Sequence, residues 1–423
     1  NLAGAGKTTI AVTDAAGNAV NPLLNLVGNL EGVKINGTVV GSAVDGYLVN
    51  TTIFSDANNN NTIDAGEAVG GSIGAGVFSI PGGSGHLIMR GGEDISTGHS
   101  FSVQYEAPEG YTVINPVSSL IASFQTLGGA TYYTLNDSGV RTNLTAEQLA
   151  SNNRLGALTD YVLSTSASEA KVLSAGLFGG LTPATAVDLS SYDAFREAGR
   201  PVTDYASATV AKDAKLAAIA YQKSAAMLAT LSDVGGAVLA VLDDTSASAP
   251  RGVLSTDSSM ALMHAVAGQL NAIPSLKLQT ALVDATQIRS ALTGAATELG
   301  LTVTTAQAAK LDQVAAVIAK ANSLISASTT ATIDGAGNDA KDAIQILRGI
   351  VAVQQVVQGD SADVLVRYVM GDTSNATDPT PSSLVSGMEA RVAGVIVGPI
   401  VPSVFKVGIV SGSATASNIT VFE

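Results

Sequence analysis

Hydrophobic and polar residues follow different spacings along this chain. Up to about residue 117, apolar and polar side chains alternate in short runs, and glycine, proline, asparagine or aspartate bounds each run. Alternation with a period of two predicts strands with one buried face, and short, closely spaced strands are typical of a β-sandwich. The predicted strands are 33–40, 47–54, 76–80, 86–90 and 100–105.

From about residue 118 to residue 371, apolar residues instead recur every three or four positions in an alanine-rich background. This spacing predicts amphipathic helices, and several of them predict a large Ala-rich helical bundle. Thr304 and Gln307 have the spacing of a capping box, which predicts a helix start. The expected buried faces are Leu216, Ile219, Ala220, Met227, Leu231 and Val234; Leu311, Val314, Ile318 and Ile325; and Ile346, Ile350, Val353 and Val357.

The two ends of the chain again favour strands. Residues 384–423 contain runs rich in valine and isoleucine at 391–397, 404–410 and 419–422, after a polar, proline-containing linker. These strands either complete the first sandwich or form a second small sheet. We therefore predict an α+β chain made of a β-prone arm (1–30), a β-sandwich (31–117), a helical domain (118–371), a linker (372–383) and C-terminal strands (384–423).

One stretch of the first region carries a specific chemical signal, the acidic and asparagine-rich segment Asp56–Glu67. Calcium takes six to eight oxygen ligands, which a twelve-residue loop supplies from alternate positions and a closing bidentate acid. Here oxygen-bearing residues fall at each required position, with a backbone carbonyl serving at position seven. We predict a Ca2+ site that stabilises the sandwich, with the ligands Asp56, Asn58, Asn60, Thr62, Asp64 and Glu67.

The loop departs from the usual pattern at position six, where Asn61 stands in place of glycine. Asparagine tolerates positive φ better than other residues with a side chain, so we expect the loop to survive the change. Strand-like residues flank the loop on both sides. We therefore expect it within a β region that it makes rigid, and not between the two helices of a calcium sensor.

The residues around this loop resemble a known class of module. Asp45–Asn58 and Asp64–Glu67 look like the calcium-loop β modules of large bacterial and cyanobacterial surface proteins, and similar loops occur in the B-type repeats of Gram-positive adhesins. Gly91–Gly98, Ala107–Gly110 and Asn115–Leu120 fit the same module. The resemblance covers roughly residues 33–125. It implies an extracellular stalk, adhesin or surface-layer module made rigid by calcium, with no catalytic residues.

Two other acidic segments have open interpretations. Asp334–Arg348 is similar to a dockerin-type loop and helix, but its loop is too short and lacks ligands at the required spacing. It is either a degenerate copy or a coincidence. The neighbouring acids Glu93 and Asp94 either lie in a solvated turn or complete the calcium site.

Composition narrows the range of functions. The formal net charge is −14, which argues against binding to nucleic acid or to an anionic membrane, because both require a clustered Lys and Arg surface. It has no cysteine, which excludes disulfides, thiolate metal sites and cysteine nucleophiles. No uncharged apolar run reaches about 18 residues, so we expect no membrane span. The chain starts without methionine, and we interpret it as a mature secreted chain whose signal peptide has been removed.

We predict that the chain is not an enzyme. It has no nucleophile-elbow sequence, and its histidines, His86, His99 and His264, are scattered. The favoured function is a secreted structural protein of the bacterial cell surface, stabilised by calcium, that self-assembles into a filament or surface layer. The alternatives are a calcium-dependent adhesin that binds a sugar, protein or surface, and an extracellular hydrolase.

The expected partners are further copies of this chain, joined through strand or helix packing. Lys7–Asp14 is β-prone, and it either adds to an open sheet edge of a neighbour or forms an ordinary first strand. Glycans are further candidates if the host glycosylates asparagine. The acceptor sequences begin at Asn36, Asn50, Asn60, Asn136, Asn143, Asn375 and Asn418.

Overall fold

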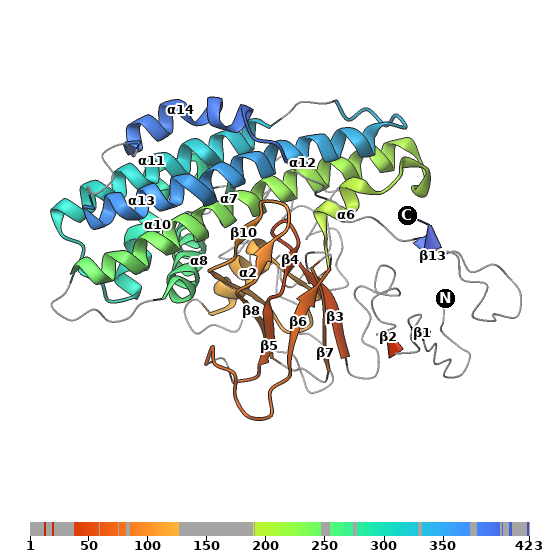
Figure 1. Ribbon diagram of the computed structural model, residues 1–423, viewed down its shortest axis with the longest axis horizontal. Coiled ribbons are helices and arrows are strands. Elements are labelled where there is room, and N and C mark those ends of the chain that lie inside the picture. Colours follow the sequence, from red (N-terminus) through yellow and green to blue (C-terminus); the bar gives the residue numbers. More distant parts are fainter. Residues whose placement is uncertain are drawn as a thin grey trace, which may run out of the picture.

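A computed structural model of the chain places a layer of long helices over a smaller, curved sheet (Figure 1). The class is α+β, as predicted. The structure describes residues 38–58, 60–74, 76–81, 85–126, 189, 191–246, 254–273, 276, 278–328, 332–372, 379–397 and 400, together with the short strands at 12–13, 19–20, 406–407 and 421–422.

The helical layer is built around one long helix, α7 (Ala208–Ser246), which contacts most of the other helices. Alanine favours this conformation because it loses no side-chain entropy in a helix. The other helices are α2 (Pro116–Thr126), α6 (Ala194–Gly199), α8 (Ser255–Ala272), α9 (Leu278–Val283), α10 (Ala285–Glu298), α11 (Thr305–Ala327), α12 (Asp339–Val356), α13 (Ala362–Met370) and α14 (Pro381–Ala393). A 3-10 turn follows α6 at Val202–Asp204, and a π-turn joins α12 to α13 at Val357–Ser361.

Seven strands form the main sheet in the order β11-β8-β5-β6-β7-β3-β12. Neighbouring strands are antiparallel except β12, which is parallel to β3. The bounds are β3 (Thr38–Ala43), β5 (Thr52–Asp56), β6 (Val69–Ile73), β7 (Val77–Pro81), β8 (His86–Arg90), β11 (Gln104–Ala107) and β12 (Val113–Ile114). A smaller sheet has the order β10-β9-β4, with β4 (Leu48–Val49), β9 (Glu93–Asp94) and β10 (His99–Ser100).

The main sheet is barrel-like, whereas we predicted a sandwich. Its first and last strands, β11 and β12, approach each other. Gly41 of β3 lets that strand lie close to the residue before β12, because a β-carbon there would lie 2.0 Å from the carbonyl oxygen of Thr112. A glycine within a strand often marks such a close approach of two backbones.

Several strands differ from the prediction, and the predicted strand 100–105 is divided between β10 and β11. The predicted strand 47–54 is divided into β4 and β5, because Asn50 adopts a φ of 58° that turns the chain. The strand β6 was not predicted, because Gly70 and Gly71 interrupt its alternating pattern. The strands β7 and β8 match the predicted runs 76–80 and 86–90 closely.

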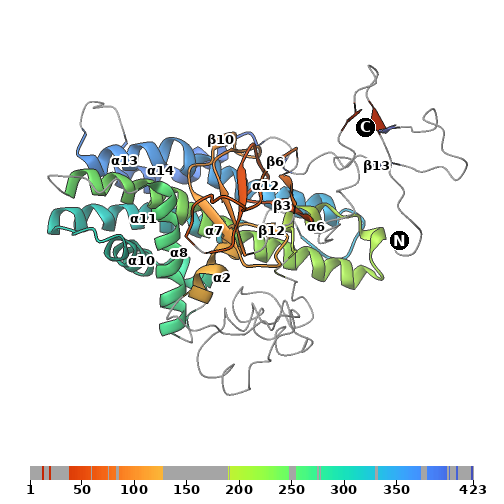
Figure 2. The same cartoon turned by 90° about the horizontal axis from the view of Figure 1, so that it is seen from below.

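Sheet and helices share one apolar core. Ile53 and Tyr105 of the sheet belong to the same contiguous cluster as Leu231 and Leu292 of the helices. Helix α2 joins the two layers, because it contacts β11 as well as α7 and α8. Figure 2 shows α2 between α8 and the sheet. Burial of apolar surface therefore holds the two layers together without a solvent-filled boundary.

The predicted helix faces agree with the structure except at two positions of α7. All the expected core residues of α11 and α12 are buried, and so is Val357, but Leu216 is 39% exposed and Ala220 is half-buried. The predicted capping box is confirmed. The N–H of Thr304 donates to Oε1 of Gln307 at 2.9 Å, and the N–H of Gln307 donates to Oγ1 of Thr304 at 3.3 Å.

Among the described helices, α7 alone is long and apolar enough to cross a membrane by length and composition. In this structure 78% of its apolar window is buried inside the molecule. A core helix of a soluble protein meets the same criterion, so this helix is weak support for a membrane span.

The C-terminal region differs from the predicted linker and strands. Residues 381–393 form α14 and not a strand. The Oγ1 atom of Thr380 accepts the N–H of Ser383 at 3.2 Å, and Pro381 occupies the first helical turn. Both are helix-start signals, and they outweigh the valine content that favoured strands.

Short strands do occur at both ends of the chain. β13 (Lys406–Val407) pairs with β14 (Val421–Phe422) in a small sheet of its own, which decides between the two alternatives for the C-terminal strands. β1 (Val12–Thr13) pairs with β2 (Ala19–Val20). The end of the Lys7–Asp14 segment therefore pairs within its own chain.

The turn between β3 and β4, Val44–Tyr47, is buried between the sheet and the helices. The hydroxyl of Tyr47 donates to Oδ2 of Asp193 at 3.0 Å. Asp193 also caps α6, and burial raises the pKa of its carboxyl to about 6. Gly46 has a φ of 145°, and a β-carbon there would lie 2.0 Å from Oγ of Ser96. This buried turn therefore requires glycine at its third position.

We expect Gly46→Ala to lower the free energy of unfolding by about 2–4 kcal/mol, because it adds a clash to an unfavourable φ. Gly98→Ala is the matched control, since Gly98 has a φ of 72° but no atom within 4 Å of an added β-carbon. It should cost only about 1 kcal/mol. Urea unfolding followed by circular dichroism measures both, and equal costs would contradict the steric explanation.

Candidate functional site

The predicted calcium loop lies at the tip of the hairpin formed by β5 and β6. Asp56 ends β5 and is 1% exposed, and Val69 begins β6. The position within a β region agrees with the prediction. Of the other predicted ligands, Glu67 is half-buried, while Asn58, Asn60, Thr62 and Asp64 are exposed.

Asp56 organises the first half of the loop. Its Oδ1 accepts the N–H of Asn60 at 3.2 Å, and its Oδ2 accepts the N–H of Asn61 at 2.7 Å. The Oδ1 atoms of Asn58 and Asn60 accept the N–H groups two residues further on, at 3.1 and 2.8 Å. These Asx turns curl the chain. Asn61 has a φ of 58°, the conformation expected of the residue at position six.

Positions three, five and nine of the loop meet at one atom. The Nδ2 atoms of Asn58 and Asn60 both donate to Oδ2 of Asp64, each at 2.7 Å. The hydrogen bonds from Asn58 and Asn60 lower the pKa of Asp64 below its usual value. Position twelve closes the loop, because Glu67 accepts the N–H of Ala57 at 2.9 Å and the N–H of Asp64 at 3.0 Å.

The donor set of the loop fits a hard cation such as Ca2+. Carboxylate, amide and backbone carbonyl oxygens are the ligands that calcium prefers. A half-turn of an asparagine amide exchanges its nitrogen and oxygen, so Asn58 and Asn60 can turn their oxygens toward Asp64. Within the described residues, no three His, Asp or Glu side chains gather closely enough to hold a metal by themselves. A bound cation would therefore depend on the neutral oxygens as well.

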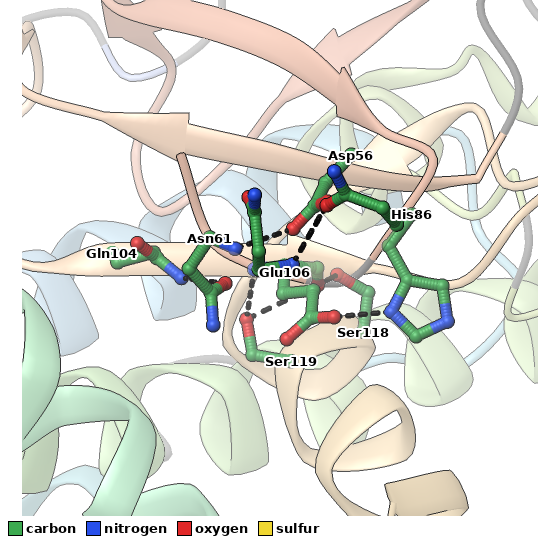
Figure 3. Close-up of polar contacts among 9 residues, drawn as sticks. Asp56, Asn61, His86, Gln104, Glu106, Ser118 and Ser119 are labelled. Carbon is green, nitrogen blue, oxygen red and sulfur yellow. Dashed lines mark hydrogen bonds and ion pairs between the residues drawn. The ribbon is translucent and has the colours of Figure 1, made fainter. Parts of the chain in front are cut away.

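Two strands behind the loop hold Asn61 in place. Figure 3 shows its contact with Gln104, whose Nε2 donates to Oδ1 of Asn61 at 3.1 Å. The Nη2 atom of Arg90 donates to the carbonyl oxygen of Asn61 at 2.7 Å, and Nε of Arg90 donates to Oε1 of Gln104 at 2.5 Å. Glycine could not make the side-chain contact. Asn61 thus turns the chain and also ties it to β8 and β11.

This connection continues into the helical layer. The N–H of Gln104 donates to Oγ of Ser259, on α8, at 3.1 Å. Gln104 lies on the strand at one end of the sheet order, so the serine satisfies a backbone group at a strand edge. A chain of hydrogen bonds therefore runs from the loop through Asn61 and Gln104 to a helix.

Asp56 also lies beside a histidine–glutamate pair (Figure 3). It is opposite His86 in the ladder of β5 and β8, and Nδ1 of His86 contacts Oε1 of Glu106. Burial alone would lower the pKa of His86, but the hydrogen bond and charge of Glu106 raise it above its usual value. The N–H of Glu106 donates to Oγ of Ser119 at 2.8 Å, and the hydroxyl of Ser118 donates to the carbonyl oxygen of Glu106 at 2.7 Å. These serines support the backbone of the glutamate at the start of α2.

The other acidic segments have structural contacts of their own. The carboxylate of Asp94 accepts hydrogen bonds from Ser96 and Thr97. It lies against Gly46 of the buried turn and not among the loop ligands.

In the dockerin-like segment, Asp339 accepts the N–H groups of Asp334 and Gly335 at 3.2 and 2.7 Å. That carboxylate thus stabilises the turn that precedes α12.

Comparison of this chain with protein-family models, with curated proteins and with solved structures finds no match in any of the three. The functional assignment therefore depends on the chemistry of the loop and its surroundings.

Sequence reasoning predicted the ligand positions but missed the residues that contact the loop. Arg90, Gln104 and Ser259 lie 29, 43 and 155 positions from their partners. No local pattern marks them, because only the folded sheet brings them next to the loop. The presence of asparagine in place of glycine at position 61 was the one local signal that this position has a second contact.

We expect Asn61→Gly to keep the turn, because glycine adopts positive φ readily, and to lose the bond to Gln104. Asn61→Gly and Gln104→Ala, alone and combined, form a double-mutant cycle. The coupling between them should be about 0.5–1.5 kcal/mol in the free energy of unfolding. Additive effects in the double mutant would show that this bond does not stabilise the fold.

Proposed function

We propose that this chain is a secreted structural protein of the bacterial cell surface, stabilised by calcium in the Asp56–Glu67 loop, that assembles with copies of itself into a filament or surface layer. The observation that carries the proposal is the convergence of Asn58, Asn60 and Asp64 on one atom inside a loop closed by Glu67. The resemblance of residues 33–125 to calcium-loop modules of surface proteins agrees with it.

A stabilising role for calcium is supported by the contacts of the loop. Asn61 is tied to two strands and, through Gln104, to α8. Asp56 lies beside the pair of His86 and Glu106, which contacts the start of α2. A cation that fixes the loop would thereby stiffen the junction of the sheet with both helices.

Self-assembly is supported by an exposed patch beside the loop. Val69 and Ile73 of β6 are 46% and 43% exposed, and Gly71 between them shares their face of the sheet. Thr52 lies opposite Gly71, and Val77 lies opposite Ile73. None of these side chains is ionisable. Copies that each carry a charge of −14 repel one another least through such an uncharged surface, which favours a second copy as the occupant.

Strand addition to the main sheet has less support. The end strand β11 is covered by α2 and α8, and one of its N–H groups is bound by Ser259. The other end strand, β12, is only two residues long. Contact through the exposed patch, which we define as Thr52, Val69, Gly71, Ile73 and Val77, is therefore the favoured mode of assembly.

Calcium at about 10 mM should raise the free energy of unfolding by about 3 kcal/mol if the dissociation constant is about 0.1 mM, as in other extracellular modules. Asp64→Asn and Glu67→Gln should weaken binding at least about tenfold, because each removes a ligand charge. Glu93→Gln is the control and should bind as the wild type does. Isothermal titration calorimetry measures the affinities, and equal binding by all four proteins would refute the assigned site.

Light scattering after size-exclusion chromatography tests assembly, with calcium and again with a chelator. We expect large particles with calcium, and monomers with the chelator. Val69→Ser combined with Ile73→Ser should prevent particle growth while leaving calcium affinity unchanged. A monomer under both conditions would contradict self-assembly and favour the adhesin instead.

A further inference from the structure

A second polar cluster lies where the sheet meets the helices. It contains three acids from separate elements, which are Asp45 in the buried turn, Asp94 in β9 and Asp233 in α7. Figure 1 shows β4 and β10, which flank β9 in the small sheet, directly beneath α7 and α12. The cluster is therefore part of the joint between the two layers.

Asp45 bridges the joint. It is 2% exposed. Its Oδ2 accepts the hydroxyl hydrogen of Tyr105, on β11, at 2.8 Å, and its Oδ1 accepts an amide hydrogen from Nε2 of Gln354, on α12, at 3.2 Å. One carboxyl thus connects the buried turn to a strand and to a helix.

Asp233 has its partner in the π-turn. Gln358 of that turn donates to Oδ2 of Asp233. Gly359 makes room for the neighbouring strand, because a β-carbon there would lie 2.8 Å from the ring of His99. Irregular turns of this kind inside helices occur frequently at functional positions. Here the side-chain amide of Gln358, in the turn, donates to the carboxyl of Asp233 on α7.

Among the described residues, the hydrogen-bond partners of the three carboxyls are uncharged. Asp94 accepts from the N–H and hydroxyl of Ser96 and from the hydroxyl of Thr97. Within the described residues, none of the three acids forms an ion pair with lysine, arginine or histidine. In the described part of the chain, the other titratable groups at the joint are Tyr105, His99 next to the π-turn, and Tyr47 of the buried turn with its partner Asp193.

Gln354 provides an independent indication that a proton binds here. It is fully buried, and its Oε1 has no hydrogen-bond partner among the residues that the structure describes, although Nε2 of the same amide faces Asp45. A half-turn of the amide would bring Oε1 against Asp45. A protonated carboxyl then supplies the hydrogen that this acceptor lacks, so Gln354 can pair with either form of Asp45.

The electrostatics agree with this geometry. Burial, then the charges of Asp233 and Asp94, raise the pKa of Asp45 well above its usual value. Burial raises the pKa of Asp233 to about 7 and also raises that of Asp94. Asp233 keeps some contact with solvent, whereas Asp45 and Asp94 are buried. Because a carboxyl has a pKa of about 3.9 in the unfolded chain, the stability from Asp233 is complete below that pH and is lost as the pH rises through about 7.

We propose that Asp45, Asp94 and Asp233 form a proton-operated latch between the sheet and the helical layer. With protons bound, the uncharged hydrogen bonds hold the buried turn against α7 and α12. When the carboxyls ionise, their charges repel one another and require water, and the joint loosens. The latch goes beyond the proposed calcium-stabilised role and acts whether or not the loop binds calcium.

The latch is tested by thermal unfolding of the full chain from about pH 5 to about pH 8.5, with chelator present so that the calcium proposal has no influence. The wild-type midpoint should fall by at least about 3 °C over this range. Asp233→Asn should remove at least half of the fall, because asparagine has the same shape and cannot ionise. Asp193, whose pKa is about 6, accounts for part of the remainder.

Hydrogen exchange locates the effect. Protection of amides in the peptides 44–49 and 352–360, corrected for the intrinsic rate, should fall at least about tenfold relative to the rest of the wild-type chain at the higher pH. The same peptides of Asp233→Asn should keep their protection. A uniform loss over the whole chain would mean that no local latch exists.

Three more variants make the outcome decisive. Asp45→Asn repeats the test if Asp233→Asn does not fold. Asp312→Asn changes an exposed acid paired with Arg289, and His99→Gln removes the neighbouring imidazole; both should keep the wild-type pH dependence. The proposal is wrong if both aspartate variants keep the wild-type fall, or if His99→Gln abolishes it. It is also wrong if added sodium abolishes the fall at high pH, since a bound cation would then neutralise the cluster.

Discussion

The polar groups of a buried turn need hydrogen-bond partners, and its backbone needs space within the core. The turn Val44–Tyr47 is buried between the sheet and the helices, so both layers must provide these partners and this space. Gly46 leaves the space, because any side chain would collide with Ser96 and Asp94. Tyr47 reaches Asp193, which caps α6. Asp45 reaches β11 and α12. The relative position of sheet and helices thus depends on the contacts that Asp45, Gly46 and Tyr47 make with both layers.

The predicted calcium loop contacts the same joint from another side. Hydrogen bonds among its carboxylates, amides and backbone N–H groups close the loop, and Asn61 connects the loop to β8 and β11. Because β11 is bound to Ser259 of α8 and covered by α2, the loop is not an independent appendage of the sheet. A ligand that makes the loop rigid can therefore affect the helical layer through hydrogen bonds that are already formed.

The two proposals describe responses of one joint to two properties of the surroundings, the calcium concentration and the pH. Calcium would act through the side-chain oxygens of Asn58, Asn60 and Asp64, which are exposed to solvent. Protons would act through Asp45 and Asp94, which are buried among uncharged partners. At a cell surface, the location that we propose for this chain, both properties vary. The small side chains of the shared core allow close packing, so loosening the joint would expose apolar surface of both layers.

Local patterns in the sequence determined the class of fold and several of the long helices, and they predicted the ligand positions of the loop. These features depend on residues a few positions apart, such as the capping box of Thr304 and Gln307 or the alternate oxygens of Asp56–Glu67. Helix α14 also had its start signals in Thr380 and Pro381, but valine-rich composition obscured them. Only the tertiary structure decided that the sheet is barrel-like, that Gln104 supports Asn61, and that Asp45, Asp94 and Asp233 meet. Those contacts join residues far apart in sequence, and they form only because one continuous core brings sheet and helices together.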